Sequence, residues 1–294
     1  MIELTDFSKN SFEKVKSIIK DMGKSKLIFQ SEAQFQHILA MRLEKEIAEN
    51  EDLKIYLEAY TNDYTYECNE KTKRCYTDIV ILDNKNMQYI AIELKYKTDK
   101  LEYNKGNFFI SLTEHSACDT GCYDYLWDIE RINKLTKNTT RGNLKSFKCI
   151  GGCAIFLTNE NYYWKYSRLP EPENEDDDCT KHNAFLIGDG SDIKKTDKLN
   201  WYEDNKDNKN NKNNKNNKNN KNNKNNKNNK NNKNNKNNKN DNDLRHKTSI
   251  TLEGVKESKF EWQEYCILNP ADCNLENSKA KKQRNIFKYL FLTV

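Results

Sequence analysis

The stretch TDIVILDNKNMQYIAIELKYK, residues 77–97, decides the fold. Residues 77–82 and 87–97 are rich in isoleucine, tyrosine and other residues that favour strands. Between them lies the polar sequence DNKN, which is typical of a tight turn. We therefore predict two antiparallel strands that form a β-hairpin.

The apolar pattern of the hairpin sets its register. If Asp78 pairs with Glu93, the loop has four residues, 84–87, which is an ordinary length. One face then carries four isoleucines that can bury against a helix: Ile79, Ile81, Ile90 and Ile92. The other face carries a different set: Asp78, Val80, Ala91, Glu93 and Lys95. A slip of one residue would break the apolar face, so we expect this register.

The second face of the hairpin carries two carboxylates and a lysine. The carboxylates of Asp78 and Glu93 repel each other, and a hard divalent cation with oxygen ligands would compensate for that repulsion. Lys95 points to the same side and can stabilise charge on a phosphate under attack or orient the attacking water. A bound metal can activate that water and polarise the phosphoryl oxygen.

The rest of the chain predicts further elements of both kinds. Apolar residues at helical spacing indicate helices over residues 12–22, from Ser31 onward, and over 123–135. Ser31 is the expected N-cap of the second helix, with Gln34 three residues on, as in a capping box. Further strands are expected at residues 53–60, 149–158, 183–187, 249–252 and 285–294. This order predicts an α/β (α+β) fold with a mixed sheet flanked by helices.

An Asn/Lys repeat interrupts the chain over residues 206–240. It carries twelve lysines and one aspartate, or +11, whereas the whole chain has a net charge of +5, so the remainder carries −6. From residue 208 to 240 there is no apolar residue, so nothing can be buried to offset the ordering entropy. We expect a long disordered loop inserted into one domain made of residues 1–205 and 241–294.

The repeat has two interpretations. It could be a basic tether that moves along phosphates, or a neutral repeat expansion, which we favour. The mildly acidic remainder means that binding to nucleic acid must be argued from a site and not from global charge.

Composition predicts a cytoplasmic protein with no membrane segment. No apolar run is long enough to cross a bilayer. The sequence MIELTDFSKN lacks the basic and then apolar pattern of a signal peptide. The nine cysteines include no C-x-x-C pair, which favours reduced thiols over a metal cluster assembled from distant cysteines.

Asp78, followed on the next strand by Glu93-Leu94-Lys95, resembles the motif of the PD-(D/E)XK nuclease superfamily, which includes many restriction and repair endonucleases. The resemblance implies that Asp78, Glu93 and the carbonyl of Leu94 bind Mg²⁺, with Mn²⁺ as an expected substitute. It implies that Lys95 acts at the phosphate. It also implies that Glu32, on the preceding helix, assists through a water or a second metal.

A second resemblance covers nearly the whole chain. Its segments are similar to those of a family of uncharacterised microbial proteins usually grouped with restriction-endonuclease-like folds: SEAQFQ, IELKYK, EHSACDTGCYDYLWDIERI, CAIFLTNENYYW, WQEYCIL and FKYLFLTV. One departure from the superfamily motif is Thr77, which stands where proline often precedes the aspartate. This resemblance implies a restriction-endonuclease-like fold and a presumed site, but no substrate.

Together these features predict a magnesium-dependent nuclease that hydrolyses DNA, with a role in defence against foreign DNA. A homodimer would suit double-strand cutting. The first alternative is a catalytically silent nuclease fold that binds nucleic acid or a partner protein, against which the intact Asp78, Glu93 and Lys95 speak. The second is an unrelated α/β interaction domain whose acidic hairpin is accidental.

Several candidate residues also have simple structural explanations. Glu32 could be an acid that is favourable in the first turn of a helix. Asp124, Asp128 and Arg131 are expected to be surface charges or to support the site from behind. Asp128 and Arg131 are three residues apart and could pair. His115 is expected to cap or pack.

The repeat gives the first testable prediction. Deleting residues 206–240 should leave the melting temperature nearly unchanged, because the segment contains nothing to bury. Thermal unfolding of the two chains checks this, and a large drop would show that the segment packs. Weaker DNA binding with a flatter salt dependence would favour the tether over the neutral expansion.

Overall fold

The computed structural model describes residues 6–65, 72–115, 117–137, 142–165, 185–199, 250–274 and 283–294. Its helices are α1 (Asp6–Lys24), α2 (Glu32–Ile47), α3 (Cys118–Lys137), the short α4 (Tyr162–Lys165), and the 3-10 turns η1 (Gly142–Leu144) and η4 (Pro270–Asp272). The first three confirm the predicted helices. The Asn/Lys repeat lies outside the described residues.

The main sheet is mixed and has six strands, in the order β1-β2-β3-β6-β9-β7. They span β1 (Leu53–Thr65), β2 (Thr72–Asp83), β3 (Gln88–Lys97), β6 (Lys148–Thr158), β7 (Trp262–Ile267) and β9 (Ile286–Thr293). Only β3 and β6 pair in parallel among these described strands. Strands from both sides of the Asn/Lys repeat therefore belong to one sheet.

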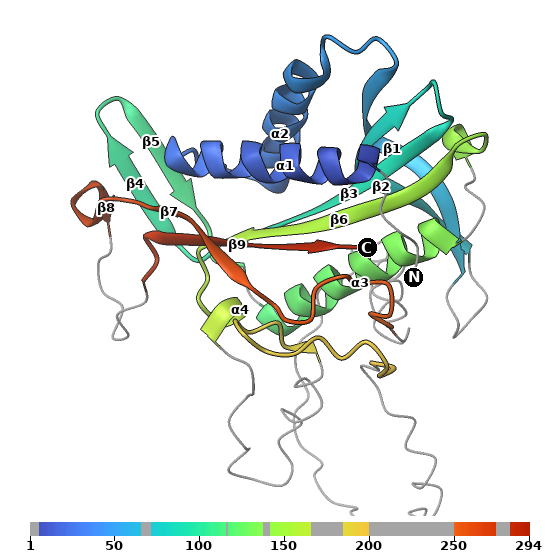
Figure 1. Ribbon diagram of the computed structural model, residues 1–294. Coiled ribbons are helices and arrows are strands. Elements are labelled where there is room, and N and C mark those ends of the chain that lie inside the picture. Colours follow the sequence, from blue (N-terminus) through green and yellow to red (C-terminus); the bar gives the residue numbers. More distant parts are fainter. Residues whose placement is uncertain are drawn as a thin grey trace, which may run out of the picture.

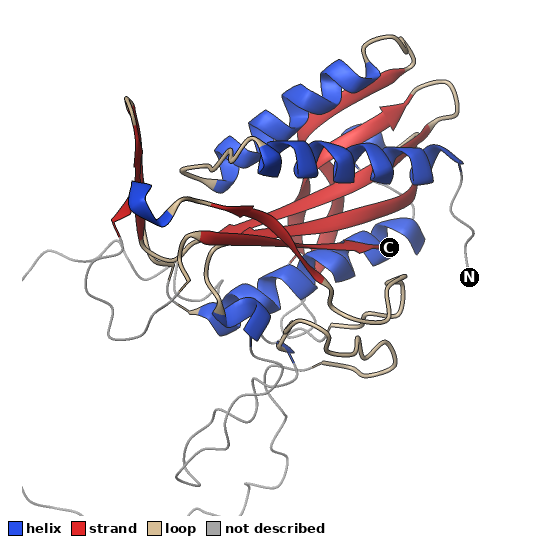
Figure 2. Cartoon of the chain, turned by 60° about the vertical axis from the view of Figure 1, so that its left-hand side comes forward, coloured by secondary structure: helices blue, strands red, loops and turns tan. Residues whose placement is uncertain are grey.

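Helices cover both faces of this sheet (Figures 1 and 2). α1 and α2 pack on one face, and their apolar residues share a core with all four hairpin isoleucines. α3 packs on the opposite face, in a second core that includes Val80 and Ala91. The alternation along β2 and β3 thus directs one set of side chains to α1 and α2 and the other set to α3.

The hairpin register is the predicted one. Ile79 pairs with Ile92 and Ile81 with Ile90, and β2 and β3 are joined by residues 84–87. All four isoleucines are at most 2% exposed. Because the register is fixed by these buried pairs, Asp78 and Glu93 lie on adjacent strands and on the face toward α3.

The predicted cap of α2 is present in a modified form. The Ser31 side chain accepts a hydrogen bond from the Gln34 N–H at 3.1 Å, as expected for an N-cap. The side-chain oxygen of Gln34, however, accepts from the N–H of Gln30 at 2.7 Å, and not from that of Ser31. This cap fixes where α2 begins and so sets the position of Glu32 in its first turn.

Two of the predicted strands are wrong. The described part of residues 183–187, from Phe185 to Ile187, is buried but not in a strand. The strand expected at 249–252 reduces to one isolated bridge between Leu199 and Ile250. In both places apolar side chains fill the core beside α3, so burial without a continuous ladder produced the strand-like pattern.

A second, small sheet was not predicted. Its order is β5-β4-β8, with β4 (Leu101–Lys105), β5 (Phe108–Leu112) and β8 (Cys273–Asn274). It projects from one end of the main sheet (Figure 1). Residues 106–107 join β4 to β5, and Gly106 has a φ of 62°, which this tight turn requires.

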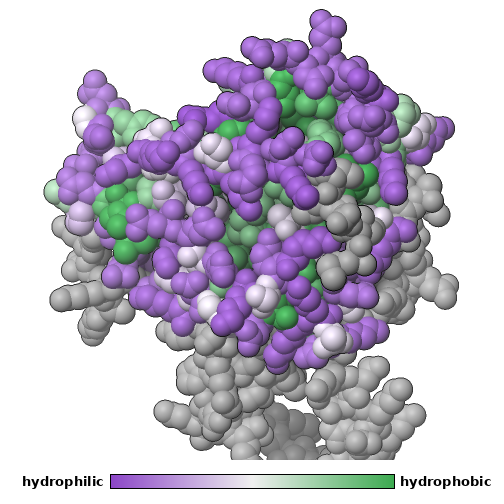
Figure 3. All heavy atoms as spheres, in the orientation of Figure 1, coloured by the Kyte–Doolittle hydropathy of each residue, from purple (hydrophilic) through white to green (hydrophobic). Residues whose placement is uncertain are grey.

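The surface seen in Figure 3 is mostly hydrophilic, and its apolar residues form small separate patches. No helix in the described part of the chain has the length and hydropathy needed to cross a membrane.

Gly23 gives a prediction about the packing of α1. A Cβ at this position would overlap the main-chain carbonyl oxygen of Tyr265 in β7. Gly23→Ala should therefore destabilise the fold by about 1–3 kcal/mol, although helix propensity alone would stabilise it by about 1 kcal/mol. Urea unfolding measures the sign, with Lys20→Ala on the exposed side of α1 as the control. A more stable Gly23→Ala protein would contradict the α1–β7 contact.

Candidate active site

The candidate site lies where β2 and β3 stop pairing, which we call the divergence point. β2 pairs with β1 from Thr72 to Asp83, but it pairs with β3 only from Ile79 onward. β3 continues to Lys97 with β6 as its parallel neighbour. Beyond Ile92, the edge of β3 that faced β2 needs other hydrogen-bond partners.

Two carboxylates provide those partners. Asp78 Oδ2 accepts a hydrogen bond from the Leu94 N–H at 2.7 Å. Glu32 Oε2, from the first turn of α2, accepts from the Tyr96 N–H at 2.8 Å. The main chain of β3 is thus held by one acid from β2 and one from α2, and both acids have fixed positions.

Gln36 connects α2 to the divergence point by hydrogen bonds. Its Nε2 donates to the carbonyl oxygen of Asp78 at 2.7 Å and to Glu58 Oε1 at 2.8 Å. Gln36 is buried and lies one helical turn after Glu32. The start of α2 is therefore anchored to both β2 and β3, which holds the divergence point in shape.

On the α3 side, four charged groups form a continuous chain of ion pairs. Arg131 Nη2 lies 3.1 Å from Glu93 Oε1, and Arg131 Nη1 lies 3.1 Å from Asp128 Oδ1. Asp128 Oδ2 lies 2.8 Å from Lys95 Nζ. Arg131 also donates to the carbonyl oxygen of Tyr76. Arg131 is shared between two acids and Asp128 between two cations, so each of these four charges has an opposite charge beside it.

Burial makes the protonation of the two hairpin acids unusual. It raises the pKa of Asp78 to about 7, and the charge of Asp128 adds to the rise while Lys95 opposes it. Burial also raises the pKa of Glu93 well above its usual value, against the effect of Arg131. The carboxylates of Asp78 and Asp128 raise it further. Burial and the neighbouring acids therefore outweigh the two cations in their effect on the pKa values of Asp78 and Glu93.

The two cations stay charged. Burial alone would lower the pKa of Lys95, but Asp128, Glu32 and Asp78 raise it above its ordinary value. Burial would likewise lower the pKa of Arg131, and Glu93 with Asp128 raises it instead. Lys95 can thus present a permanent positive charge, and Leu94 O accepts from its Nζ at 3.5 Å.

The structure brings the predicted residues together at the divergence point: Asp78, Glu93, Leu94, Lys95 and Glu32. The expected pairing of Asp128 with Arg131 is confirmed. Of the two expected placements, at the surface or behind the site, the structure agrees with the second, because Asp128 is buried, Arg131 is largely covered and both contact site residues. Both stand among the apolar positions of α3, next to Trp127 and Ile132, and charges on the buried face of a helix are a signal that they serve a site.

The donor atoms suit a hard divalent cation in type. They are the carboxylates of Asp78 and Glu93 and the carbonyl of Leu94, all oxygen. Glu93 Oε1 is buried and lacks a hydrogen bond, although Arg131 contacts it. The described residues contain no group of three or more His, Cys, Asp or Glu side chains arranged to hold a metal. An ion bound here would therefore complete its shell with main-chain and water oxygens.

Some residues outside the divergence point have structural roles. The N–H of Thr98 donates to His115 Nδ1 at 3.0 Å, so His115 packs on the residue that follows β3, which is the second of its two expected roles. Tyr163 and Trp164 are buried in the core beneath α3.

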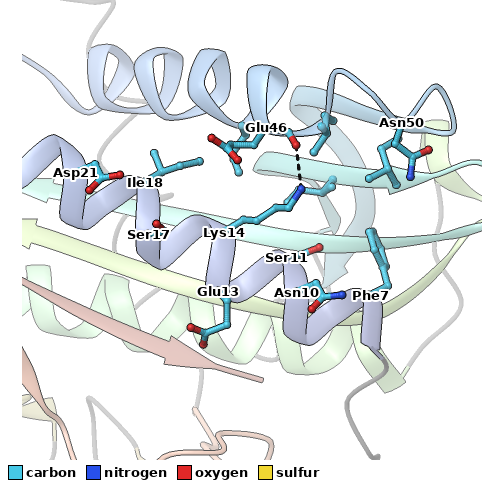
Figure 4. A pocket seen from close by; sticks show the side chains of 14 residues that line it. Phe7, Asn10, Ser11, Glu13, Lys14, Ser17, Ile18, Asp21, Glu46 and Asn50 are labelled. Atoms are coloured by element: carbon cyan, nitrogen blue, oxygen red, sulfur yellow. Dashed lines mark hydrogen bonds between the residues drawn. The ribbon is translucent and has the colours of Figure 1, made fainter.

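A cavity of about 550 Å³ lies between α1 and α2 (Figure 4). The Lys14 side chain crosses it and donates to the carbonyl oxygen of Glu46 at 2.9 Å. Its lining includes Ile81, which faces α1 and α2, and none of the candidate site residues. This cavity is therefore on the other side of the sheet from the ion-pair chain.

Comparisons of the chain with protein-family models, with curated proteins and with solved structures give no match.

The ion-pair chain predicts a strong dependence of stability on Arg131. Arg131→Met should lower the free energy of unfolding by roughly 3 kcal/mol, because it leaves the buried carboxylate of Glu93 without its counter-charge. Adding Glu93→Gln should recover part of the loss, because the uncompensated charge is then removed. Urea unfolding of the single and double variants measures both effects.

The matched control is Lys137→Met on the same helix. Lys137 pairs with Glu253 at the surface, and this change should alter stability little. An Arg131→Met protein as stable as the parent would show that the Glu93 carboxylate is solvated or protonated without Arg131.

Proposed function

We propose that this chain is a metal-dependent nuclease that hydrolyses DNA phosphodiester bonds, with a restriction-endonuclease-like fold of the PD-(D/E)XK type. The observation that carries the proposal is the divergence point. There Asp78, Glu93 and Lys95 meet on one face, and carboxylates hold the main chain of β3 where its edge toward β2 no longer pairs with that strand.

Asp78 and Glu93, with the carbonyl of Leu94, would bind Mg²⁺, and Mn²⁺ would substitute for it. The bound ion would supply an activated water and polarise the phosphoryl oxygen. Two carboxylates whose pKa values are raised by burial are chemically suited to this task, because a cation relieves the charge that burial penalises.

Lys95 would act on the substrate, whereas Glu32 would maintain the geometry of the site. The Lys95 ammonium would stabilise the charge that develops on the phosphate, and its pairing with Asp128 keeps it charged and oriented. Glu32 is a positioning residue, since its carboxylate holds the Tyr96 N–H and so fixes the strand that carries Glu93 and Lys95.

The alternative is a catalytically silent nuclease fold that binds DNA or a partner protein. The internal ion pairs favour this alternative, because Glu93 already contacts Arg131 and Lys95 already contacts Asp128. The two functions differ in one respect that can be measured, namely hydrolysis that depends on a divalent cation.

The test compares cleavage of plasmid and of single-stranded DNA with and without Mg²⁺. Asp78→Asn and Glu93→Gln should each lower the rate by roughly 10²-fold or more, because each removes a charged oxygen ligand. Lys95→Met should lower it to a similar extent but leave Mg²⁺ binding by calorimetry largely intact. Glu32→Gln should have a smaller effect.

The matched control is Asp83→Asn, which removes a buried carboxylate at the other end of β2, where Asn86 and Gln88 contact it. It should leave the rate near that of the parent. A parent protein that binds DNA but never cleaves it would support the silent fold. Parental rates in Asp78→Asn and Glu93→Gln would show that any activity arises elsewhere.

A further inference from the structure

β1 and β2 extend beyond the divergence point as a two-stranded arm, residues 59–65 and 72–78. Among the described strands, residues 72–78 pair with β1 alone. Side chains two residues apart on a strand share a face, so Arg74, Tyr76 and Asp78 form a row along one side of the arm. The row ends at the candidate active site and places Tyr76 about 7 Å along the strand from Asp78.

A pair of aromatic rings lies on this face. Tyr60 is directly opposite Tyr76 in the ladder, and their ring centroids are 5.8 Å apart with an interplanar angle of 41°. The guanidinium of Arg74 lies over the Tyr60 ring, 5.5 Å from its centroid. Tyr76 itself is 43% exposed. A large aromatic side chain is therefore open to solvent next to a largely buried charged site.

Further contacts hold the Tyr60 ring and the main chain of Tyr76. The Tyr60 hydroxyl donates to Asp63 Oδ1 at 2.6 Å, and its ring packs so closely on Gly142 that a Cβ there would overlap it. The carbonyl oxygen of Tyr76 accepts a hydrogen bond from Arg131, which also contacts Glu93. The main chain that carries the exposed ring is therefore linked to the carboxylates of the site through Arg131.

We propose that Tyr76, backed by Tyr60 and Arg74, is a stacking subsite for an unpaired base of single-stranded DNA. This inference rests on the proposed function for the identity of the neighbouring site. Base–aromatic stacking needs an open π-face, and bases in a duplex already stack on their neighbours. Arg74 supplies the positive charge that the adjoining backbone phosphate requires. The preferred substrate is thus single-stranded DNA, including frayed ends.

The experiment measures binding without hydrolysis, in buffer with EDTA and low salt. The probe is a mixed-sequence single-stranded oligonucleotide that carries 2-aminopurine, whose fluorescence falls on stacking, and the same strand annealed into a duplex. The parent should bind the single strand more tightly than the duplex and quench its fluorescence. Tyr76→Ala should weaken single-strand binding about tenfold or more and abolish the quenching, whereas Tyr76→Phe should retain both.

The matched control is Tyr56→Ala. Tyr56 is 48% exposed and lies on the same strand pair, but opposite Val80 and away from the Tyr60–Tyr76 pair. It should bind like the parent. Equal losses in Tyr56→Ala and Tyr76→Ala, or no loss in Tyr76→Ala, would overturn the subsite, as would tighter binding of the duplex.

The outcome is independent of catalysis. Stacking that depends on Tyr76 in a protein that never cleaves DNA would support the subsite and refute the nuclease. A Tyr76→Ala protein that cleaves and binds DNA like the parent would support the nuclease and refute the subsite. A protein that binds neither DNA form would overturn the subsite and leave the exposed ring to a protein partner.

Discussion

The hydrogen bonds that two carboxylates accept from the main chain of β3 determine the form of the whole candidate site. The N–H groups of Leu94 and Tyr96 lie beyond the last β2–β3 pair, and buried main-chain donors without partners would be costly. Asp78 and Glu32 accept from them at 2.7 and 2.8 Å. Hydrogen bonds to charged acceptors are stronger than neutral ones, so the strands can separate here without loss of order.

Where β2 and β3 separate, charged side chains gather in a buried region, and burial makes their charge energetically costly. Glu93 is 2% exposed and Asp128 is 4% exposed. Each is tolerable only because Arg131 and Lys95 lie within ion-pair distance. Apolar residues of the same size would serve stability at least as well. A fold that retains these acids and bases together at one point has sacrificed stability there, which is typical of a functional site.

Much of this arrangement could be predicted from local sequence. The isoleucine alternation fixes the hairpin register, and the register places Asp78 and Glu93 on one face. The β4–β5 hairpin carried a usable signal as well, since Gly106-Asn107, between the alternating residues 101–105 and the apolar residues 108–112, is a hairpin turn.

Other features depend on non-local pairing, which periodicity does not encode. β9 inserts between β6 and β7, and the arm extends β1 and β2 past the point where β3 leaves them. Arg131 could be paired with Asp128 by spacing alone, but its contact with Glu93 requires that α3 cross the sheet at this position.

Arg131 connects the arm to the candidate site through three contacts. A single guanidinium contacts the carbonyl of Tyr76 on β2, the carboxylate of Glu93 on β3 and the carboxylate of Asp128 on α3. Its planar fork has fixed donor directions, so a change in the charge of Glu93 alters the balance of the other two contacts. A lysine could not hold three acceptors in this geometry. The main chain that carries the exposed Tyr76 ring and the carboxylates of Glu93 and Asp128 are therefore linked through one side chain.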